Sequence, residues 1–171
     1  MGLGSMSQKL LVLLFVFGSI FISKATSRIS SDAKVYSKEY YKNGSLKAEG
    51  WAIGKMKTNY WTFYHKNGII ASKGSFKNNY KNGYWYFYTD GGSLIKEGHF
   101  NRGIIEKWWV FYDIATSNKT KIQYKNNAKN GIALYYQKNK LIKSAKYINN
   151  HKTGEWTSVF NFRRDNPDLN F

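Results

Sequence analysis

The chain has 171 residues, which is enough for one domain of ordinary size, and it carries a formal net charge of +17. It contains no cysteine, so disulfide bonds, a cysteine nucleophile and a lipid-modified cysteine are all excluded. Aromatic residues make up 18% of the chain, and Leu, Ile and Val are sparse beyond residue 25. We therefore expect a fold that buries rings more than aliphatic side chains.

The first segment has the pattern of a secretory signal peptide. An apolar run over residues 10–22 follows a lysine, and small residues stand at Ser23 and Ala25, where a signal peptidase reads them. The run is shorter than the roughly 20 residues that a membrane span needs. We expect a signal helix within residues 1–25, cleavage after Ala25 and export, with an uncleaved membrane anchor as the alternative. Residues 26–34 are polar and predict a linker.

A repeat with a step of 24 residues follows the linker. The phrase Trp-x-Phe-Tyr begins at Trp61, Trp85 and Trp109, and glycines recur with the same step. A fixed period of this length is typical of stacked repeat architectures. The alternation of residue types within each unit favours strands over helices, with one hairpin per repeat. The repeat-defining residues are Trp61, Phe63, Tyr64, Gly74, Trp85, Phe87, Tyr88, Gly98, Trp109, Phe111, Tyr112 and Trp156.

Taken in chain order, the strands are expected in pairs closed by short turns. The first pair covers residues 35–41 and 46–52, and the same two-strand unit recurs over 60–76 and 84–100. Asn, Gly and Lys dominate the segments between the pairs, which predicts longer exposed loops there. These loops are expected at 54–59, 77–83 and 101–107.

The hairpin turns also predict a register. Asn67-Gly68 favours a two-residue type I′ turn, because both central residues of that turn need a positive φ. Pairing outward places Trp61 opposite Gly74, and the next hairpin places Trp85 opposite Gly98. Each indole is then expected to lie across the glycine that it faces, because glycine leaves room for the ring. We expect these rings to form the core face, with a platform that stacks sugars or bases as the alternative.

The last two units depart from the pattern. Ala133 stands where a tryptophan is expected, and the turn near Ala115-Thr116 lacks glycine. The fifth unit is one residue short near Asn139-Lys140 and resumes at Trp156. Degenerate end units are typical of the cap of a repeat array. We expect an all-β, elongated antiparallel meander over 35–160, with about five units and ten strands, and a frayed tail over 161–171 that contains Arg163-Arg164.

The repeated phrases resemble the MORN-repeat variant family of bacteria. They read Tyr-x-x-Asn-Gly-x-Leu/Ile, Gly-x-Phe and Gly-x-Trp-x-x-Tyr, with the best copies at 64–70, 74–76 and 83–88. The resemblance covers roughly residues 36–160. It implies a repeat sheet with one hairpin per repeat, generally without catalytic residues. Some members are labelled antitoxin-like, and MORN proteins elsewhere are tied to membranes or protein scaffolds.

Residues for catalysis or for metal binding show no common pattern. His65, His99 and His151 fall at three different phases of the repeat, so no single strand face gathers them. Glu49 and Glu97 share a phase, but the other carboxylates are few and scattered. We therefore predict no catalytic residue, no cofactor and no metal.

The lysines concentrate in the C-terminal half, where no acid occurs between Asp113 and Glu155. They could form a solvated face that also protects sheet edges. They could instead form a patch for an anionic partner, although the predicted export argues against nucleic acid. The lysines of this candidate patch are Lys119, Lys121, Lys125, Lys129, Lys138, Lys140, Lys143, Lys146 and Lys152.

The expected function is that of an exported, non-enzymatic repeat module for protein–protein interaction at the cell envelope. It would use its ring-rich face or a terminal edge strand. One alternative is attachment to an anionic lipid or polysaccharide through the lysine-rich half. Another is an antitoxin-like or immunity partner, which the resemblance suggests.

Overall fold

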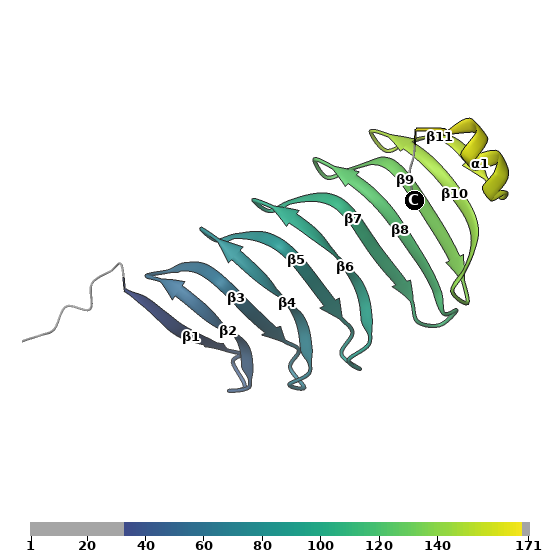
Figure 1. The fold of residues 1–171 in the computed structure, drawn as a ribbon. Helices are drawn as coiled ribbons and strands as arrows, with labels where there is room; N and C mark the ends of the chain where they lie inside the picture. Colours follow the sequence, from purple (N-terminus) through teal and green to yellow (C-terminus); the bar gives the residue numbers. More distant parts are fainter. Residues whose placement is uncertain (1–32, 169–171) are drawn as a thin grey trace, which may run out of the picture.

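The computed structural model describes residues 33–168, so the predicted signal peptide and most of the predicted linker lie outside the described residues. Within this range the chain forms one open sheet of eleven antiparallel strands, in sequence order from β1 to β11, followed by the short helix α1 (Val159–Asp165). Figure 1 shows the strands side by side in a single layer, with α1 beside the last of them. The predicted all-β meander is confirmed, with one strand more than expected.

The strands are β1 (Lys34–Tyr40), β2 (Leu46–Ile53), β3 (Met56–Tyr64), β4 (Ile70–Lys77), β5 (Tyr80–Tyr88), β6 (Leu94–Asn101), β7 (Ile104–Asp113), β8 (Asn118–Lys125), β9 (Ala128–Gln137), β10 (Lys140–Ile148) and β11 (His151–Trp156).

The hairpin at Asn67-Gly68 has a three-residue loop, so the predicted type I′ turn is wrong. The Gly68 N–H donates to the His65 carbonyl at 2.9 Å, and the His65 N–H donates to the Ile69 carbonyl at 2.8 Å. Gly68 has φ +85°, whereas Asn67 has no positive φ, which is the geometry of a type I turn followed by a left-handed glycine. The same hydrogen bonds recur at the turn before β6.

The predicted register nevertheless holds. A bulge between Phe63 and Tyr64 absorbs the extra residue of the loop, so that Trp61 still pairs with Gly74. The equivalent bulge next to Tyr88 leaves Trp85 opposite Gly98. Beyond the bulge, the strand pairs therefore have the same register that a two-residue turn would have given.

The opposite ends of the strands carry the two-residue turns, where longer loops were predicted. Lys77 pairs with Tyr80 across Asn78 (φ 52°) and Asn79 (φ 65°), which is a type I′ turn. Asparagine adopts positive φ more readily than other residues with a side chain, so it suits both positions. Residues near 56–59, 80–83 and 104–107 consequently belong to strands β3, β5 and β7.

One side of the sheet, here called the Trp–Phe face, holds the aromatic core. Trp61, Trp85 and Trp109 are 1%, 0% and 2% exposed, although the sheet has a single layer. Around Trp85, the ring of Phe76 lies edge-on at 5.1 Å, and Phe87 stacks at 6.0 Å. The rings of this face belong to Trp61, Phe63, Phe76, Trp85, Phe87, Phe100, Trp109 and Phe111.

Each indole lies across a glycine, but not across the one that was predicted. A β-carbon at Gly74 would overlap the Trp85 ring, and one at Gly98 would overlap the Trp109 ring. The prediction that the Trp85 indole covers Gly98 is therefore wrong, although the two residues are paired. Trp61 and Trp85 have a glycine on both neighbouring strands, whereas Trp109 has Gly98 on one side and Ile122 on the other. In all three cases the ring lies over the glycine of the preceding strand.

The opposite side, here called the tyrosine face, is more polar. The hydroxyl of Tyr64 donates to Glu49 and that of Tyr112 donates to Glu97, both at 2.6 Å. These two pairs are related by two repeats, which explains why the two glutamates share a phase. Burial first, then the neighbouring glutamate, raises the pKa of Tyr84 to about 12.

The fourth unit replaces the Trp–Gly pair by a pair of complementary size. Ile122 stands in the glycine phase and pairs with Ala133, which stands in the tryptophan phase. Both side chains are buried, at 6% and 0% exposure. The bulk that Ala133 lacks is thus supplied by Ile122 on the neighbouring strand.

The bulge between β10 and β11 changes the face of the last tryptophan, because the register shifts there by one residue and not by the two residues of the equivalent bulge between β4 and β5. Trp156 pairs with Ser144 and packs with Phe162 of α1, over the tyrosine face. A shift of one residue moves every side chain of a strand to the other face. The prediction that Trp156 repeats the role of Trp85 is therefore wrong.

Candidate binding groove

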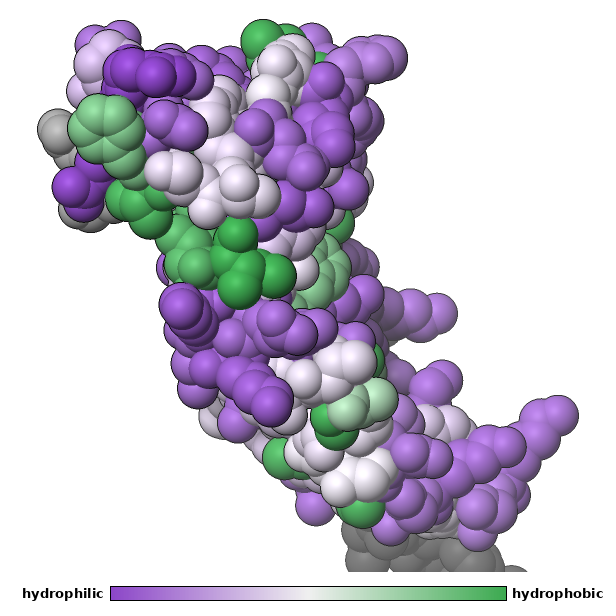
Figure 2. Space-filling view, turned by 90° about the vertical axis from the view of Figure 1, so that its right-hand side faces the viewer, coloured by the Kyte–Doolittle hydropathy of each residue, from purple (hydrophilic) through white to green (hydrophobic). Residues whose placement is uncertain are grey.

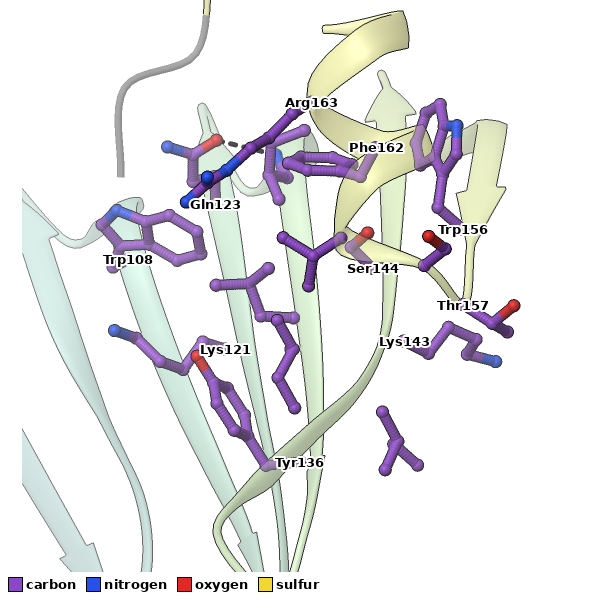
Figure 3. A pocket seen from close by; sticks show the side chains of 16 residues that line it. Trp108, Lys121, Gln123, Tyr136, Lys143, Ser144, Trp156, Thr157, Phe162 and Arg163 are labelled. Carbon is purple, nitrogen blue, oxygen red and sulfur yellow. Dashed lines mark hydrogen bonds between the residues drawn. The ribbon is translucent and has the colours of Figure 1, made fainter.

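A groove of about 490 Å³ lies on the tyrosine face, between strands β7–β10 and helix α1. Its floor includes Ile132, Leu134 and Leu141, and Trp108 and Tyr136 also line it (Figure 3). Ile132 and Leu134 are nearly buried, at 2% and 8% exposure. The positions of Ile132 and Leu134 hold Tyr84 and Tyr86 two repeats earlier, so this part of the aliphatic floor belongs to the degenerate C-terminal units.

Helix α1 forms a wall of the groove and is tied to the sheet at several points. Phe162 is 5% exposed and belongs to the cluster with Ile132 and Leu134. The Trp156 indole N–H donates to Asp165 at 2.8 Å, and the Lys146 ammonium donates to the Asn166 amide oxygen at 3.3 Å. These contacts fix the position of α1 over the floor.

Sequence reasoning missed this helix, because residues from 161 onward were expected to be a frayed tail. The local signal was present. Ser158 caps the helix by accepting a hydrogen bond from the Asn161 N–H at 3.4 Å, and Phe162 is the apolar residue that a helix of two turns needs on its buried face. A helix of this length is not stable alone, so its packing on the sheet decides its formation.

Lys121, Gln123 and Arg163 are among the hydrogen-bond donors that line the groove. Lys121 lies over the Trp108 ring at 5.3 Å, and neither Lys121 nor Arg163 has an acidic partner among residues 33–168. Gln123 accepts the Ile132 N–H at 2.7 Å, and its amide nitrogen points away from that bond in Figure 3. The same view shows Arg163 reaching from α1 toward the side of the groove where Trp108 and Lys121 lie.

The nine lysines of the predicted patch do not gather on one surface. Lys119 and Lys121 lie over Tyr136 and Trp108 on the tyrosine face, and Lys146 contacts α1 there. Lys129 and Lys143 lie over Tyr147 and Tyr135, which pack on the opposite face. Lys143 and Lys152 also form ion pairs with Glu155. Lys125, Lys138 and Lys140 stand at turns or strand ends.

The tryptophan row is core and not a stacking platform. Besides the rings around it, Trp85 has the Lys81 ammonium above its face at 4.7 Å, and Lys57 lies over Trp61 at 4.0 Å. Burial, and secondarily the charge of Lys96, lower the pKa of Lys81. A sugar or base could not stack on these indoles without displacing the lysines and phenylalanines that cover them.

The edge strand β1 is a second candidate surface. It pairs with β2 on one side, and no strand of the described chain pairs with its other side. Val35, Tyr36 and Tyr40 are 40%, 52% and 58% exposed. Two charged residues of β1 form ion pairs with the neighbouring strands: Lys38 with Glu49 of β2, and Glu39 with Lys57 of β3.

The three histidines lie apart, as their different phases in the repeat predicted. His65 contacts the Tyr88 carbonyl at 3.0 Å, and His151 is exposed at the start of β11. His99 packs edge-on against Tyr84 at 4.7 Å, and its pKa is lowered by burial and by Lys107. Within residues 33–168, no three His, Asp or Glu side chains come together as a metal site would require. No helix in this range is long and apolar enough to cross a membrane.

Comparison with protein-family models gave no match to this chain, and comparison with curated proteins gave none either. Family membership therefore stays a prediction that rests on the repeated phrases alone.

Proposed function

We propose that this protein is a non-enzymatic repeat module that binds a protein partner at the cell envelope. The observation that carries the proposal is the open edge of β1, seven residues long, with apolar and aromatic side chains exposed along it. An extended segment of a partner can add to such an edge through backbone hydrogen bonds, while pockets between side chains select its sequence. The envelope location rests on the predicted signal peptide.

The two ends of the sheet differ in a way that supports this choice. Proteins usually protect edge strands with charges, short length or a covering element. At the far edge, β11 has six residues, carries the Lys152–Glu155 ion pair and leads into α1. At the near edge, Tyr36 instead packs edge-on against the half-exposed Trp51, with ring centres 5.4 Å apart. This aromatic pair offers an anchor beside the unpaired backbone.

The test is capture of a partner from native envelope extract by the tagged chain and by two variants. We expect the double variant Tyr36→Ser/Tyr40→Ser to lose the partner. Tyr80→Ser is the matched control, because Tyr80 is as exposed as Tyr40, at 58%, but begins β5 in the middle of the sheet. Equal capture by all three proteins, each verified as folded by its thermal melt, would contradict the proposal.

A second candidate function is attachment to an anionic surface. It is favoured by α1, which exposes Val159 and Phe160 at 52% and 75% beside Arg163 and Arg164. Figure 2 shows a band of apolar side chains crossing the upper part of this view, with hydrophilic side chains on either side. Such a surface suits an interface with anionic lipid.

Salt separates the two functions. Sedimentation with vesicles of phosphatidylglycerol should fall steeply as ionic strength rises past the physiological range, because exposed charges are then screened. Binding of a protein to the β1 edge should change little. Vesicle binding that is equally strong for neutral phosphatidylcholine would contradict the surface-attachment alternative.

A further inference from the structure

We infer that the groove beneath α1 binds a single-chain anionic amphiphile, namely a long-chain fatty acid, with its carboxylate at Arg163, Lys121 and Gln123 and its chain along the aliphatic floor. This inference rests on the groove alone and does not depend on the proposed function. It assigns a ligand class to residues that sequence patterns had placed in a lysine patch or in a tail.

The polar part of the groove has the chemistry to hold a carboxylate. Arg163 offers a planar set of donors that can bind both carboxylate oxygens, and Lys121 offers a second positive charge. The Ile132 N–H engages the Gln123 amide oxygen, which leaves the Gln123 amide nitrogen as a third donor with no partner among the described residues. Glu155 and Asp165 are both occupied, by Lys152 and by Arg164 and Trp156, and so do not neutralise these donors.

The remainder of the lining has the chemistry to hold an alkyl chain. Leu134 and Leu141 lie on the floor, Phe162 closes one side, and Ile142, which is 44% exposed, continues the apolar surface. The volume of about 490 Å³ falls in the range of small-molecule sites, about 300–1,000 Å³. A ligand with one chain and one charge matches a groove that is apolar along its floor and cationic at one side.

Charge complementarity selects this occupant over others. A neutral alkyl chain would leave Arg163 and Lys121 without a counter-charge, and a second copy of this strongly basic chain would bring further positive charge to the site. An alkyl ammonium would be repelled for the same reason. The lining therefore favours an anionic head.

Titration calorimetry of the full chain with dodecanoate, kept below its micelle concentration, tests the inference. We expect saturable binding of one molecule per chain. Dodecanol and dodecyltrimethylammonium have the same chain without the negative charge, and butyrate has the same carboxylate with little chain. Dodecanol and dodecyltrimethylammonium should each bind at least about tenfold more weakly, since an ion-paired hydrogen bond is worth more than 1.4 kcal/mol. Butyrate should also bind at least about tenfold more weakly, because it lacks most of the chain that the apolar floor would bury.

Two arginines on the same helix provide a matched pair of variants. Arg163→Gln should weaken dodecanoate binding about tenfold, whereas Arg164→Gln should leave it unchanged, because Arg164 pairs with Asp165 and does not line the groove. Ile142→Glu should also weaken binding, by placing a negative charge on the apolar surface. Far-ultraviolet circular dichroism and melting confirm that each variant is folded.

Three results would each overturn the inference. One is no saturable binding of dodecanoate to the folded chain. Another is equal binding of dodecanoate and dodecyltrimethylammonium, which would show that the groove is an apolar surface without selectivity for charge. The last is a dimer in analytical ultracentrifugation that Ile142→Glu dissociates, which would make the groove an interface between copies.

Discussion

The indole of Trp85 lies across Gly74 of the preceding strand, and its N–H donates to the carbonyl of Ser75, the next residue, at 3.0 Å. The same bond joins Trp61 to the Trp51 carbonyl and Trp109 to the His99 carbonyl. In each case the strand pairing shifts register directly after the glycine. The indole N–H therefore gives a hydrogen-bond partner to a backbone carbonyl next to this bulge. One side chain thus covers the glycine backbone and satisfies a polar group at the bulge.

Replacement of Trp85 should show how much this arrangement contributes to stability. Trp85→Ala should lower the free energy of unfolding by about 3–5 kcal/mol, because it removes a fully buried ring from the centre of the Trp–Phe face. Gly74→Ala should also be destabilising, since the new β-carbon overlaps the ring. Urea denaturation of both variants measures these changes.

A double-mutant cycle identifies the glycine that the ring covers. Gly74→Ala should be much less harmful in a Trp85→Ala background, because the ring that it displaces is gone. Gly98→Ala is the control and should be equally harmful in both backgrounds, because its β-carbon meets Trp109. If Trp85→Ala instead relieved the effect of Gly98→Ala and not that of Gly74→Ala, the Trp85 ring would have to cover Gly98.

The Ile122–Ala133 pair should be convertible into the pair of the middle repeats. Ala133→Trp alone should destabilise the protein by about 1–3 kcal/mol, because the indole meets Ile122 in a packed site. Adding Ile122→Gly should recover part of that loss, although glycine itself weakens a strand. Thermal melts of the single and double variants decide the matter, and a double variant less stable than Ala133→Trp would refute size compensation.

Asn79 should be sensitive to substitution for two separable reasons. Its φ is +65°, and its side-chain oxygen accepts the Lys57 N–H across the neighbouring hairpin. Asn79→Gly keeps the backbone conformation and loses about 0.5–1.5 kcal/mol for the hydrogen bond. Asn79→Ala should lose about 1–2 kcal/mol more, for the left-handed conformation. Equal stability of the two variants in urea would argue against strain at this turn.

Alkaline pH should unfold the protein through its tyrosines. Burial and the hydrogen bond to Glu49 raise the pKa of Tyr64 to about 12, from 10.0. Between these values the unfolded chain loses the proton and the folded chain keeps it, so stability is complete below pH 10 and falls as pH rises toward 12. Tyr64→Phe should flatten this decline in a pH series of urea denaturations, and an unchanged slope would exclude Tyr64 as a contributor.

The candidate groove shows where sequence reasoning reached its limit. Lys121 was recognised as part of a basic segment, and Arg163 as part of a basic tail, but nothing in their spacing joined them. They share a site because α1 folds back over β9 and β10, held by Phe162 and by the bond from Trp156 to Asp165. Such contacts between distant residues leave no periodic trace in a sequence.

The sequence by itself determined the meander, the repeat and the pairing of Trp61 with Gly74, because a strict period and alternation along strands are local properties of the chain. The tertiary structure alone decided which of two neighbouring glycines the indoles of Trp61 and Trp85 cover, since both glycines have room for a ring. It also decided the face of Trp156, because the β10–β11 bulge is one residue smaller than its equivalents, and a shift of one residue turns a side chain to the other face.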